Sequence, residues 1–262
     1  MVGLADLVVP TALAVDEDVL RSRQHRVQAE CAEDLLDITN HTLKDRPLII
    51  AAGGPSLADT FDGEAWQNLD VMATNGTAEW LMRRGVDPRW HVILDGRERV
   101  KDYITSYSPP GMVTLIASSV HPAVWRAVQS RPYRAFHTFA DAGITAVGGG
   151  PTVGLRAIVL GHILGYRTIL LHGFDSSSDG PTGFQQTLHV YGDRPDHKID
   201  QVVEVHQRQF MTNAELIQQA QNFYPTVELV ERDGTSVYLC GHGLLPTMVQ
   251  GDNDPSALWG LS

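Results

Sequence analysis

The sequence contains few cysteines and has no long hydrophobic run. Its two cysteines, Cys31 and Cys240, lie far apart and outside any CxxC motif, which excludes a disulfide framework and a cysteine-based zinc site. Apolar runs such as residues 113–117 and 168–171 are far shorter than the ~20 residues of a membrane span. Residues 1–10 also lack the basic start of a signal peptide. We therefore expect a reduced, cytoplasmic protein without a membrane span.

Positive charge is also scarce. Lysine and arginine total 20 against 31 aspartate and glutamate residues, so the formal net charge is −11 at pH 7. A protein that binds nucleic acid needs a basic face that displaces counterions from the phosphates. We therefore expect no nucleic acid partner, although a local basic pocket for a single nucleotide is compatible with this charge.

Several common catalytic and nucleotide-binding motifs are absent. No glycine-lysine-serine/threonine triplet occurs, so the chain has no P-loop. Neither glycine cluster has the GxGxxG spacing of a classical dinucleotide-binding turn. The HExxH and GxSxG motifs are missing as well, which leaves a zinc hydrolase and a nucleophile-elbow hydrolase without support.

Short apolar runs alternate with helical patterns from residue 47 onward, after an amphipathic stretch over residues 16–44. The alternation predicts an α/β fold: a Rossmann-like, open, mostly parallel sheet with helices on both faces, plus an N-terminal helical extension. The strands are expected at residues 47–53, 70–75, 90–95, 112–118, 133–139 and 167–175, with helices at 77–84 and 152–164.

The remainder of the chain has a less regular pattern. Residues 176–200 are rich in serine, glycine, proline and aspartate and predict a long loop, of the kind that often serves as a lid or binding segment. We expect a helix over residues 199–223 and closing strands at 227–230 and 236–240. The predicted organisation is a helical extension (1–46), one nucleotide-binding catalytic domain (47–250) and a tail (251–262).

Polar and glycine residues follow the ends of five predicted strands. They are Gly53 to Ser56, Asn75, Asp95, Ser118 and Asp175. Right-handed crossovers place the C-terminal ends of all parallel strands at one edge of the sheet, and open α/β sheets bind their ligands there. We therefore expect these residues to surround one binding site.

Two glycine clusters are candidate phosphate-binding turns. In the first, Gly53, Gly54, Pro55 and Ser56 join a buried strand to a helix, and exposed N–H groups there can hold an anion. In the second, Gly149 and Gly150 precede Thr152 at the start of a helix, whose N-terminus favours an anion or a ribose hydroxyl. A tight turn and a flexible loop without a ligand are the respective alternatives.

The charged residues of this edge suggest phosphate chemistry. Asp95 and Asp175 can together hold Mg²⁺ with substrate phosphates completing its shell, or each can bind a ribose hydroxyl or cap a helix. Arg97 is a candidate for neutralising phosphate charge, with a surface ion pair as the alternative. His189 lies in the long polar loop, where it can deprotonate a hydroxyl nucleophile or simply be solvated.

Five ordered blocks of this sequence resemble the 6-hydroxymethylpterin diphosphokinase MptE-like family. They span residues 47–191, about half of the chain, and their order and spacing carry the resemblance rather than any single block. The blocks are GGPSL at 53–57, ATNGT at 73–77, RGVDP at 84–88 with VILD at 92–95, GGPTVG at 149–154, and LGYRTILLHGFD at 164–175.

The resemblance implies a nucleotide-binding transferase. Archaeal members of the family transfer diphosphate from ATP to a hydroxymethylpterin with Mg²⁺, which is the first expectation. Bacterial relatives transfer nonulosonic acids from CMP-activated sugars, and similar sialyltransferases use a histidine base, a role that His189 can fill. The resemblance therefore implies ATP or a CMP-sugar as co-substrate, a small-molecule acceptor, and Asp95, Asp175 and His189 as catalytic candidates. A homo-oligomer and a nucleotide-binding protein without turnover remain open.

Overall fold

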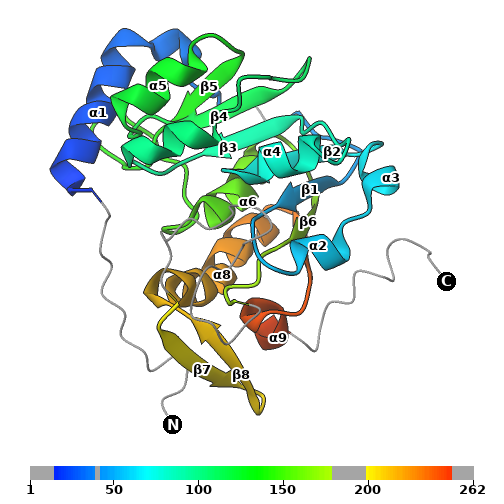
Figure 1. The fold of residues 1–262 in the computed structure, drawn as a ribbon. Coiled ribbons are helices and arrows are strands. Elements are labelled where there is room, and N and C mark those ends of the chain that lie inside the picture. Colours follow the sequence, from blue (N-terminus) through cyan, green and yellow to red (C-terminus); the bar gives the residue numbers. More distant parts are fainter. Residues whose placement is uncertain (1–14, 39–41, 179–198, 250–262) are drawn as a thin grey trace.

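Seven parallel strands form one open sheet in the computed structural model, which describes residues 15–38, 42–178 and 199–249. The order across the sheet is β5-β4-β3-β2-β1-β6-β9. This arrangement confirms the predicted Rossmann-like α/β class (Figure 1). The strands are β1 (Leu48–Ala51), β2 (Asp70–Thr74), β3 (Trp90–Ile93), β4 (Val113–Ala117), β5 (Tyr133–Phe136), β6 (Thr168–His172) and β9 (Ser236–Cys240).

The central strands are apolar because both faces of the sheet are covered. In β1, Leu48 and Ile50 pack into one hydrophobic cluster while Ile49 and Ala51 pack into a second. All four residues are buried, as the near-continuous apolar run requires for a parallel strand. Because successive side chains of a strand point to opposite faces, alternate residues of β1 pack into the two different hydrophobic clusters.

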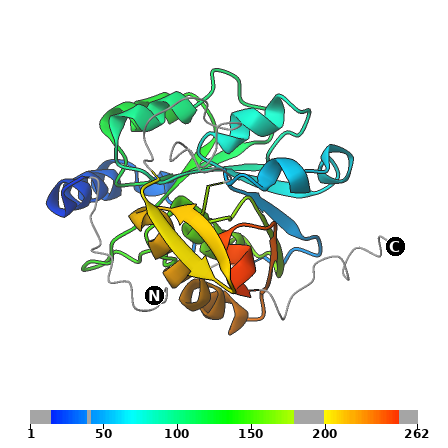
Figure 2. The ribbon, with the colours of Figure 1, turned by 60° about the horizontal axis from the view of Figure 1, so that its bottom comes forward.

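Helices cover both faces of this sheet. Helices α4 and α5 lie on one face, and α6 and α8 lie on the other (Figures 1 and 2). Helix α6 contacts β1, β2 and β3 and packs against α8. The helices are α1 (Glu17–Glu30), α2 (Leu57–Thr60), α3 (Gly63–Trp66), α4 (Thr77–Met82), α5 (Pro122–Val128), α6 (Val153–Ile163), α8 (Ala214–Glu231) and α9 (Leu244–Val249), with 3₁₀ turns η2 (Ala32–Asp34) and η3 (Glu98–Tyr103).

The strand order reverses direction at β1. Strands β2 to β5 follow on one side of β1, whereas β6 and β9 lie on its other side. Ligands of open α/β sheets bind outside the carboxyl ends of the strands at such a switch point. The five predicted strand-end positions all directly follow β1, β2, β3, β4 or β6, so the sequence placed them at the correct edge.

The predicted N-terminal helix over residues 16–44 is too long. Helix α1 begins after Asp16, whose side chain caps the N–H of Asp18, and it ends at Glu30. The chain then becomes extended at Leu35, and Leu36 donates its N–H to the carbonyl of Ala135 beside β5. The apolar residues beyond Cys31 therefore pack on the sheet edge rather than continuing the helix.

The prediction for residues 199–230 is wrong in two places. Residues 201–212 form an antiparallel hairpin of β7 (Gln201–Val205) and β8 (Arg208–Thr212), not a helix (Figure 2). The turn residues His206 and Gln207 both have positive φ and lack the usual glycine or asparagine signal. The predicted strand at 227–230 belongs to α8, which continues through Pro225 because Val227 and Val230 face the core.

Several other predictions are settled or lie outside the described residues. Both cysteines are free thiols, which confirms the absence of a disulfide. No helix in the described ranges has the length and apolar character that crossing a membrane requires. The predicted tail at 251–262 and most of the predicted loop at 176–200 lie outside the described residues. The division into an extension and a catalytic domain stays a prediction.

Candidate functional site

A cavity of about 320 Å³ opens at the C-terminal edge of the sheet. Turns that follow β1, β2, β3, β4, β5 and β6 contribute to its wall, together with α1, the N-terminus of α6 and the first turns of α8. Six of the predicted site residues line it: Gly53, Gly54, Asn75, Asp95, Arg97 and Thr152. The cavity therefore collects the strand ends that the sequence indicated.

The first glycine turn has few N–H groups left for a phosphate. The N–H of Gly54 donates to the carbonyl of Gly173 at 2.8 Å, and the N–H of Ser56 donates to the carboxylate of Asp175 at 2.9 Å. A Cβ on Gly54 would lie 2.2 Å from that carboxylate, so close packing of the turns after β1 and β6 requires glycine here. Pro55 and Ser56 are buried and do not line the cavity. Of the four residues of the expected cradle, Gly53 and Gly54 line the cavity, and the N–H of Gly54 is already bonded to Gly173.

Asp175 lies beneath the turn rather than in the cavity. It is 1 % exposed, and its carboxylate accepts hydrogen bonds from the backbone N–H groups of Ser56 and Gly243. Burial raises the pKa of this carboxyl, and the hydrogen bonds from Ser56 and Gly243 oppose that rise. Asp175 therefore fastens the turn after β1 to the segment after β9, which is a structural contact.

The second glycine cluster leads into a helix that faces the cavity. Gly149 and Gly150 adopt positive φ, and they form the turn before α6 without lining the cavity themselves. Thr152 caps α6 by accepting a hydrogen bond from the N–H of Leu155. Pro151, Thr152, Val153 and Gly154 all line the cavity. The positive end of the α6 dipole and its first N–H groups therefore border this space.

Arg156 is the site residue that sequence reasoning missed. Its guanidinium donates to the carbonyls of Gly150 at 3.1 Å, Thr138 at 3.5 Å and Val147, and it borders the cavity. Burial lowers its pKa to about 10, so the side chain is still protonated at pH 7. Within the described ranges it makes no ion pair with a carboxylate, and carbonyl groups leave its charge uncompensated. The sequence does single out Arg156, because it is the one charged residue of α6.

Asp95 and Arg97 form an ion pair at the cavity wall. Arg97 donates its backbone N–H to one carboxylate oxygen at 2.8 Å, and its guanidinium donates to the other oxygen through Nε at 2.6 Å and through Nη2. Burial lowers the pKa of Arg97, but the hydrogen bonds and charge of Asp95 outweigh this effect and raise it. The alternative of a local ion pair, considered for Arg97 from sequence, is the one that the structure contains.

The described residues do not form the expected two-aspartate Mg²⁺ site. Asp95 lines the cavity, but Arg97 occupies both of its oxygens, and Asp175 is buried elsewhere with backbone partners. In the described part of the chain, no group of three or more histidine, cysteine, aspartate or glutamate side chains is arranged to hold a metal ion. The described residues therefore provide no two-aspartate ligand set for Mg²⁺.

Asn75 is held in an unusual conformation at the end of β2. Its φ is 49°, a left-handed value that asparagine tolerates better than most residues. Its carbonyl oxygen accepts a hydrogen bond from His91 Nε2 at 2.8 Å, and burial lowers the pKa of His91 to about 4. The side-chain Oδ1 is buried without a partner among the described residues. The conformation of Asn75 is therefore fixed at the cavity wall, with its Oδ1 shielded from the open space.

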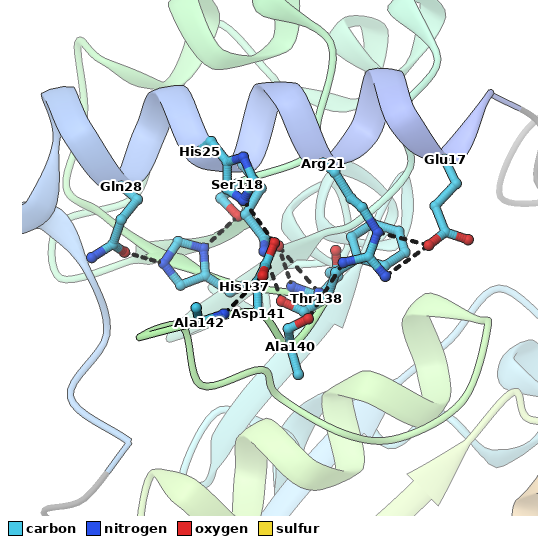
Figure 3. Close-up of polar contacts among 12 residues, drawn as sticks. Glu17, Arg21, His25, Gln28, Ser118, His137, Thr138, Ala140, Asp141 and Ala142 are labelled. Atoms are coloured by element: carbon cyan, nitrogen blue, oxygen red, sulfur yellow. Dashed lines mark hydrogen bonds and ion pairs between the residues drawn. The ribbon is translucent and has the colours of Figure 1, made fainter.

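Ser118 belongs to a contact between α1 and the sheet, not to the cavity (Figure 3). Its hydroxyl lies 2.8 Å from His137 Nδ1, while His137 Nε2 lies 2.6 Å from Gln28 Oε1 on α1. Burial, with a smaller effect of His25, lowers the pKa of His137 and favours its neutral form. The neighbouring Ser119 lines the cavity instead, 3.1 Å from the hydroxyl of Thr138.

The predicted base, His189, lies outside the described residues. Its role therefore stays a prediction.

Of the predicted residues, the structure brings together the two glycines after β1, Asn75, the Asp95–Arg97 pair and Thr152, and it adds Arg156.

The sequence matches the model of the 6-hydroxymethylpterin diphosphokinase MptE-like family over residues 24–180, which is more than half of the chain. No curated protein matches the sequence. The match begins within α1 and ends after β6, so it includes every strand end that lines the cavity.

Two solved structures resemble the fold. The MAf glycosyltransferase from Magnetospirillum magneticum AMB-1 has a TM-score of 0.61 and 15% identity, over 88% of this chain and 37% of that chain. The sialyltransferase CstII from Campylobacter jejuni, solved in complex with a substrate analogue, cytidine-5'-monophosphate, has a TM-score of 0.40 and 14% identity, over 78% of this chain and 84% of that chain. This chain therefore spans little more than a third of the length of the first protein.

Proposed function

Because the chain belongs to the 6-hydroxymethylpterin diphosphokinase MptE-like family, we propose that it is a nucleotide-dependent transferase whose cavity binds the phosphate of a nucleotide donor. The observation that carries this proposal is the uncompensated guanidinium of Arg156 beside the N-terminus of α6. A guanidinium and the first N–H groups of a helix are both ligands that phosphate prefers.

The charge of the cavity favours a donor with a single phosphate. Asp95 pairs with Arg97, and Glu215 also lines the cavity and raises the pKa of Arg97. The two arginines and the two carboxylates of the described wall therefore balance in number, which leaves no surplus positive charge for several phosphates. A nucleoside triphosphate carries several more negative charges, which Mg²⁺ usually compensates. We therefore favour glycosyl transfer from a CMP-activated sugar, and the fold of the MAf glycosyltransferase is consistent with that chemistry.

In this reaction the described residues bind and orient the donor. Arg156 and the α6 N-terminus hold the phosphate, which leaves as part of CMP when the sugar carbon forms its bond to the acceptor oxygen. His189 takes the proton of the acceptor hydroxyl as general base. The acceptor is a small molecule with a free hydroxyl group.

The second candidate is diphosphate transfer from ATP to a hydroxymethylpterin-like alcohol. The description of the matched family favours it, since that description names a diphosphokinase. This reaction depends on Mg²⁺, which would have to be held mainly by the substrate phosphates because the described residues offer no two-aspartate site.

The two candidates differ in co-substrate and in metal dependence. We would incubate the full chain with CMP-activated nonulosonic acids or with ATP, each with Mg²⁺ or with a chelator, and measure released CMP or AMP. Glycosyl transfer predicts CMP release that survives chelation. AMP formed only with Mg²⁺ and a pterin alcohol would replace it by the diphosphokinase proposal. Binding without release of either product would contradict turnover and leave a nucleotide-binding protein.

The role of His189 as general base can be tested separately by mutation. Replacing His189 with alanine is expected to lower CMP release strongly while leaving CMP affinity within about two-fold, because a general base contributes 10²–10⁴-fold to rate and little to donor binding. His206→Asn is the matched control, since His206 is exposed in the β7–β8 turn. Full activity in His189→Ala would remove His189 from the mechanism.

A further inference from the structure

The cavity has an apolar end beneath α1 in addition to its phosphate end. Leu20 borders it from α1, and Val15 borders it from just before that helix. Leu94, Tyr103 and Phe139 border it from the sheet side. Along the strand order the cavity extends from Gly53, which follows the central β1, to Phe139, which follows the edge strand β5. At about 4.8 Å per strand, one long cavity therefore runs across several strands. Arg156 lies beside the apolar end, since its guanidinium donates to the carbonyl of Thr138 at 3.5 Å.

Helix α1 fits closely against this end of the cavity. A Cβ on Gly96 would lie 2.6 Å from Leu20 Cδ2, so the absence of a side chain there lets Leu20 approach the turn after β3. Arg23 fastens the helix to the same turn by donating to the Gly96 carbonyl at 2.8 Å. The apolar side chains of α1 are thus placed next to the Asp95–Arg97 pair.

Phe139 is fixed from α1 by two neighbouring residues. Gln24, which has no exposed surface, accepts the N–H groups of Thr138 and Phe139 with Oε1 at 3.0 and 3.1 Å. Its Nε2 donates to the Phe139 carbonyl at 2.7 Å. The guanidinium of Arg21 packs over the Phe139 ring, 4.8 Å from its centre, beside the contacts that Figure 3 shows. Arg21 covers one face of the ring, and Phe139 is among the residues that line the cavity.

We propose that this apolar end binds the flat heteroaromatic base of the donor nucleotide, with Phe139 and Leu20 as the residues that determine affinity for the base. The inference rests on the proposed function, because it assumes a nucleotide whose phosphate lies at Arg156. An aromatic ring and aliphatic side chains held rigidly around a slot suit a stacked base. The volume of about 320 Å³ suits one small ligand, so base and phosphate share one cavity.

The test compares ligands that share a phosphate but differ in the base. Isothermal titration calorimetry would measure CMP, AMP and ribose 5-phosphate with the wild type and with Phe139→Ala, Phe139→Leu and Leu20→Ala. Val19→Ala is the matched control, because Val19 is 43 % exposed on the same helix and does not line the cavity. Circular dichroism would show that each variant is folded, and Phe139→Leu preserves apolar volume if alanine does not fold.

We expect the substitutions to weaken binding of the nucleotides but not of ribose 5-phosphate. Phe139→Ala and Leu20→Ala should weaken the better-bound nucleotide about ten-fold, or ~1.4 kcal/mol, and Phe139→Leu should weaken it less. Ribose 5-phosphate should bind all variants within about two-fold of the wild type, and Val19→Ala should change nothing. Unchanged nucleotide affinity, or an equal loss for both kinds of ligand, would overturn the base site while the phosphate site stands. Failure of the wild type to bind any of these ligands would instead contradict the proposed function.

Discussion

At the residue scale, burial separates two aspartates that the sequence places in equivalent positions. Asp95 and Asp175 each follow a parallel strand by two or three residues. Asp95 borders the cavity and pairs with Arg97, whereas Asp175 is 1 % exposed and accepts backbone N–H groups. Position at a strand end therefore identifies the correct edge of the sheet, but the direction of the side chain decides between binding and support.

The buried carboxyl of Asp175 predicts a pH dependence of stability. Its pKa in the folded state is raised above its ordinary value of 3.8, so the folded protein holds this proton more tightly than the unfolded chain. The stability that this group contributes is complete below the unfolded pKa and is lost as pH rises through the folded pKa. The free energy of unfolding of the wild type, relative to Asp175→Asn, should therefore fall as pH rises from 4 to 7.

Urea unfolding of both proteins across that pH range measures this difference. Asparagine does not titrate, so the comparison cancels the contribution of every other group. A difference that is constant with pH, or one that grows as pH rises, would show that Asp175 has no raised pKa in the folded protein.

At the scale of elements, helix α1 is attached mainly by polar contacts. The side chain of Gln24 satisfies three backbone groups of Thr138 and Phe139, and Gln28 reaches His137 on the same segment after β5 (Figure 3). Val27 adds a buried apolar contact. The segment 137–139, which lines the apolar end of the cavity, therefore depends on α1 for its backbone partners.

Replacing Gln24 with alanine should lower the free energy of unfolding. The change leaves the N–H groups of Thr138 and Phe139 and the Phe139 carbonyl without partners, at about 2–4 kcal/mol in total. Ser22→Ala on the exposed side of α1 is the control and should change stability by less than about 0.5 kcal/mol. Chemical denaturation measures both variants. Equal stability of Gln24→Ala and the wild type would show that these hydrogen bonds do not hold α1 on the sheet.

The β7–β8 turn is a second element that mutation can test. His206 has a φ of 49° and Gln207 a φ of 63°, values that fit a two-residue hairpin turn but suit asparagine and glycine better. The double change His206→Asn with Gln207→Gly should therefore stabilise the protein by about 1 kcal/mol. A thermal melt measures the effect. A lower melting temperature would mean that the two side chains make stabilising contacts outside this turn.

The success of the sequence predictions differs between elements for physical reasons. Strands such as β1 and β6 are buried on both faces, so their apolar runs are unambiguous, and the glycine turns after them mark their ends. The hairpin at 201–212 has an exposed face and an atypical turn, which made its pattern resemble a helix. Helix α8 contains Pro225 and β-branched residues near its end, and tertiary packing overrides both.

At the scale of the whole molecule, topology explains how much of the site could be predicted. The order of parallel strands brings the ends of β1 to β6 to one edge, so residues as distant in sequence as Gly53 and Thr152 line one cavity. Arg156 and the apolar wall of α1 were missed because they lie on helices, where the sequence shows only an isolated arginine and ordinary amphipathic positions. Their place in the cavity depends on how the helices pack.

The proposed phosphate site therefore depends on one charge at the sheet edge. Arg156 borders the cavity, remains protonated and has no carboxylate partner among the described residues, so it should hold the phosphate of a nucleotide. Arg126, which is exposed on α5 and lies outside the cavity, offers a matched control.

Isothermal titration calorimetry of CMP with the wild type, Arg156→Met and Arg126→Met tests this claim most directly. We predict that the wild type and Arg126→Met bind CMP equally, while Arg156→Met binds CMP at least ten-fold more weakly, a loss of ~1.4 kcal/mol or more. Circular dichroism of the three proteins would confirm that each is folded. A folded Arg156→Met protein that binds CMP as tightly as the wild type would contradict the phosphate site on which the proposed function rests.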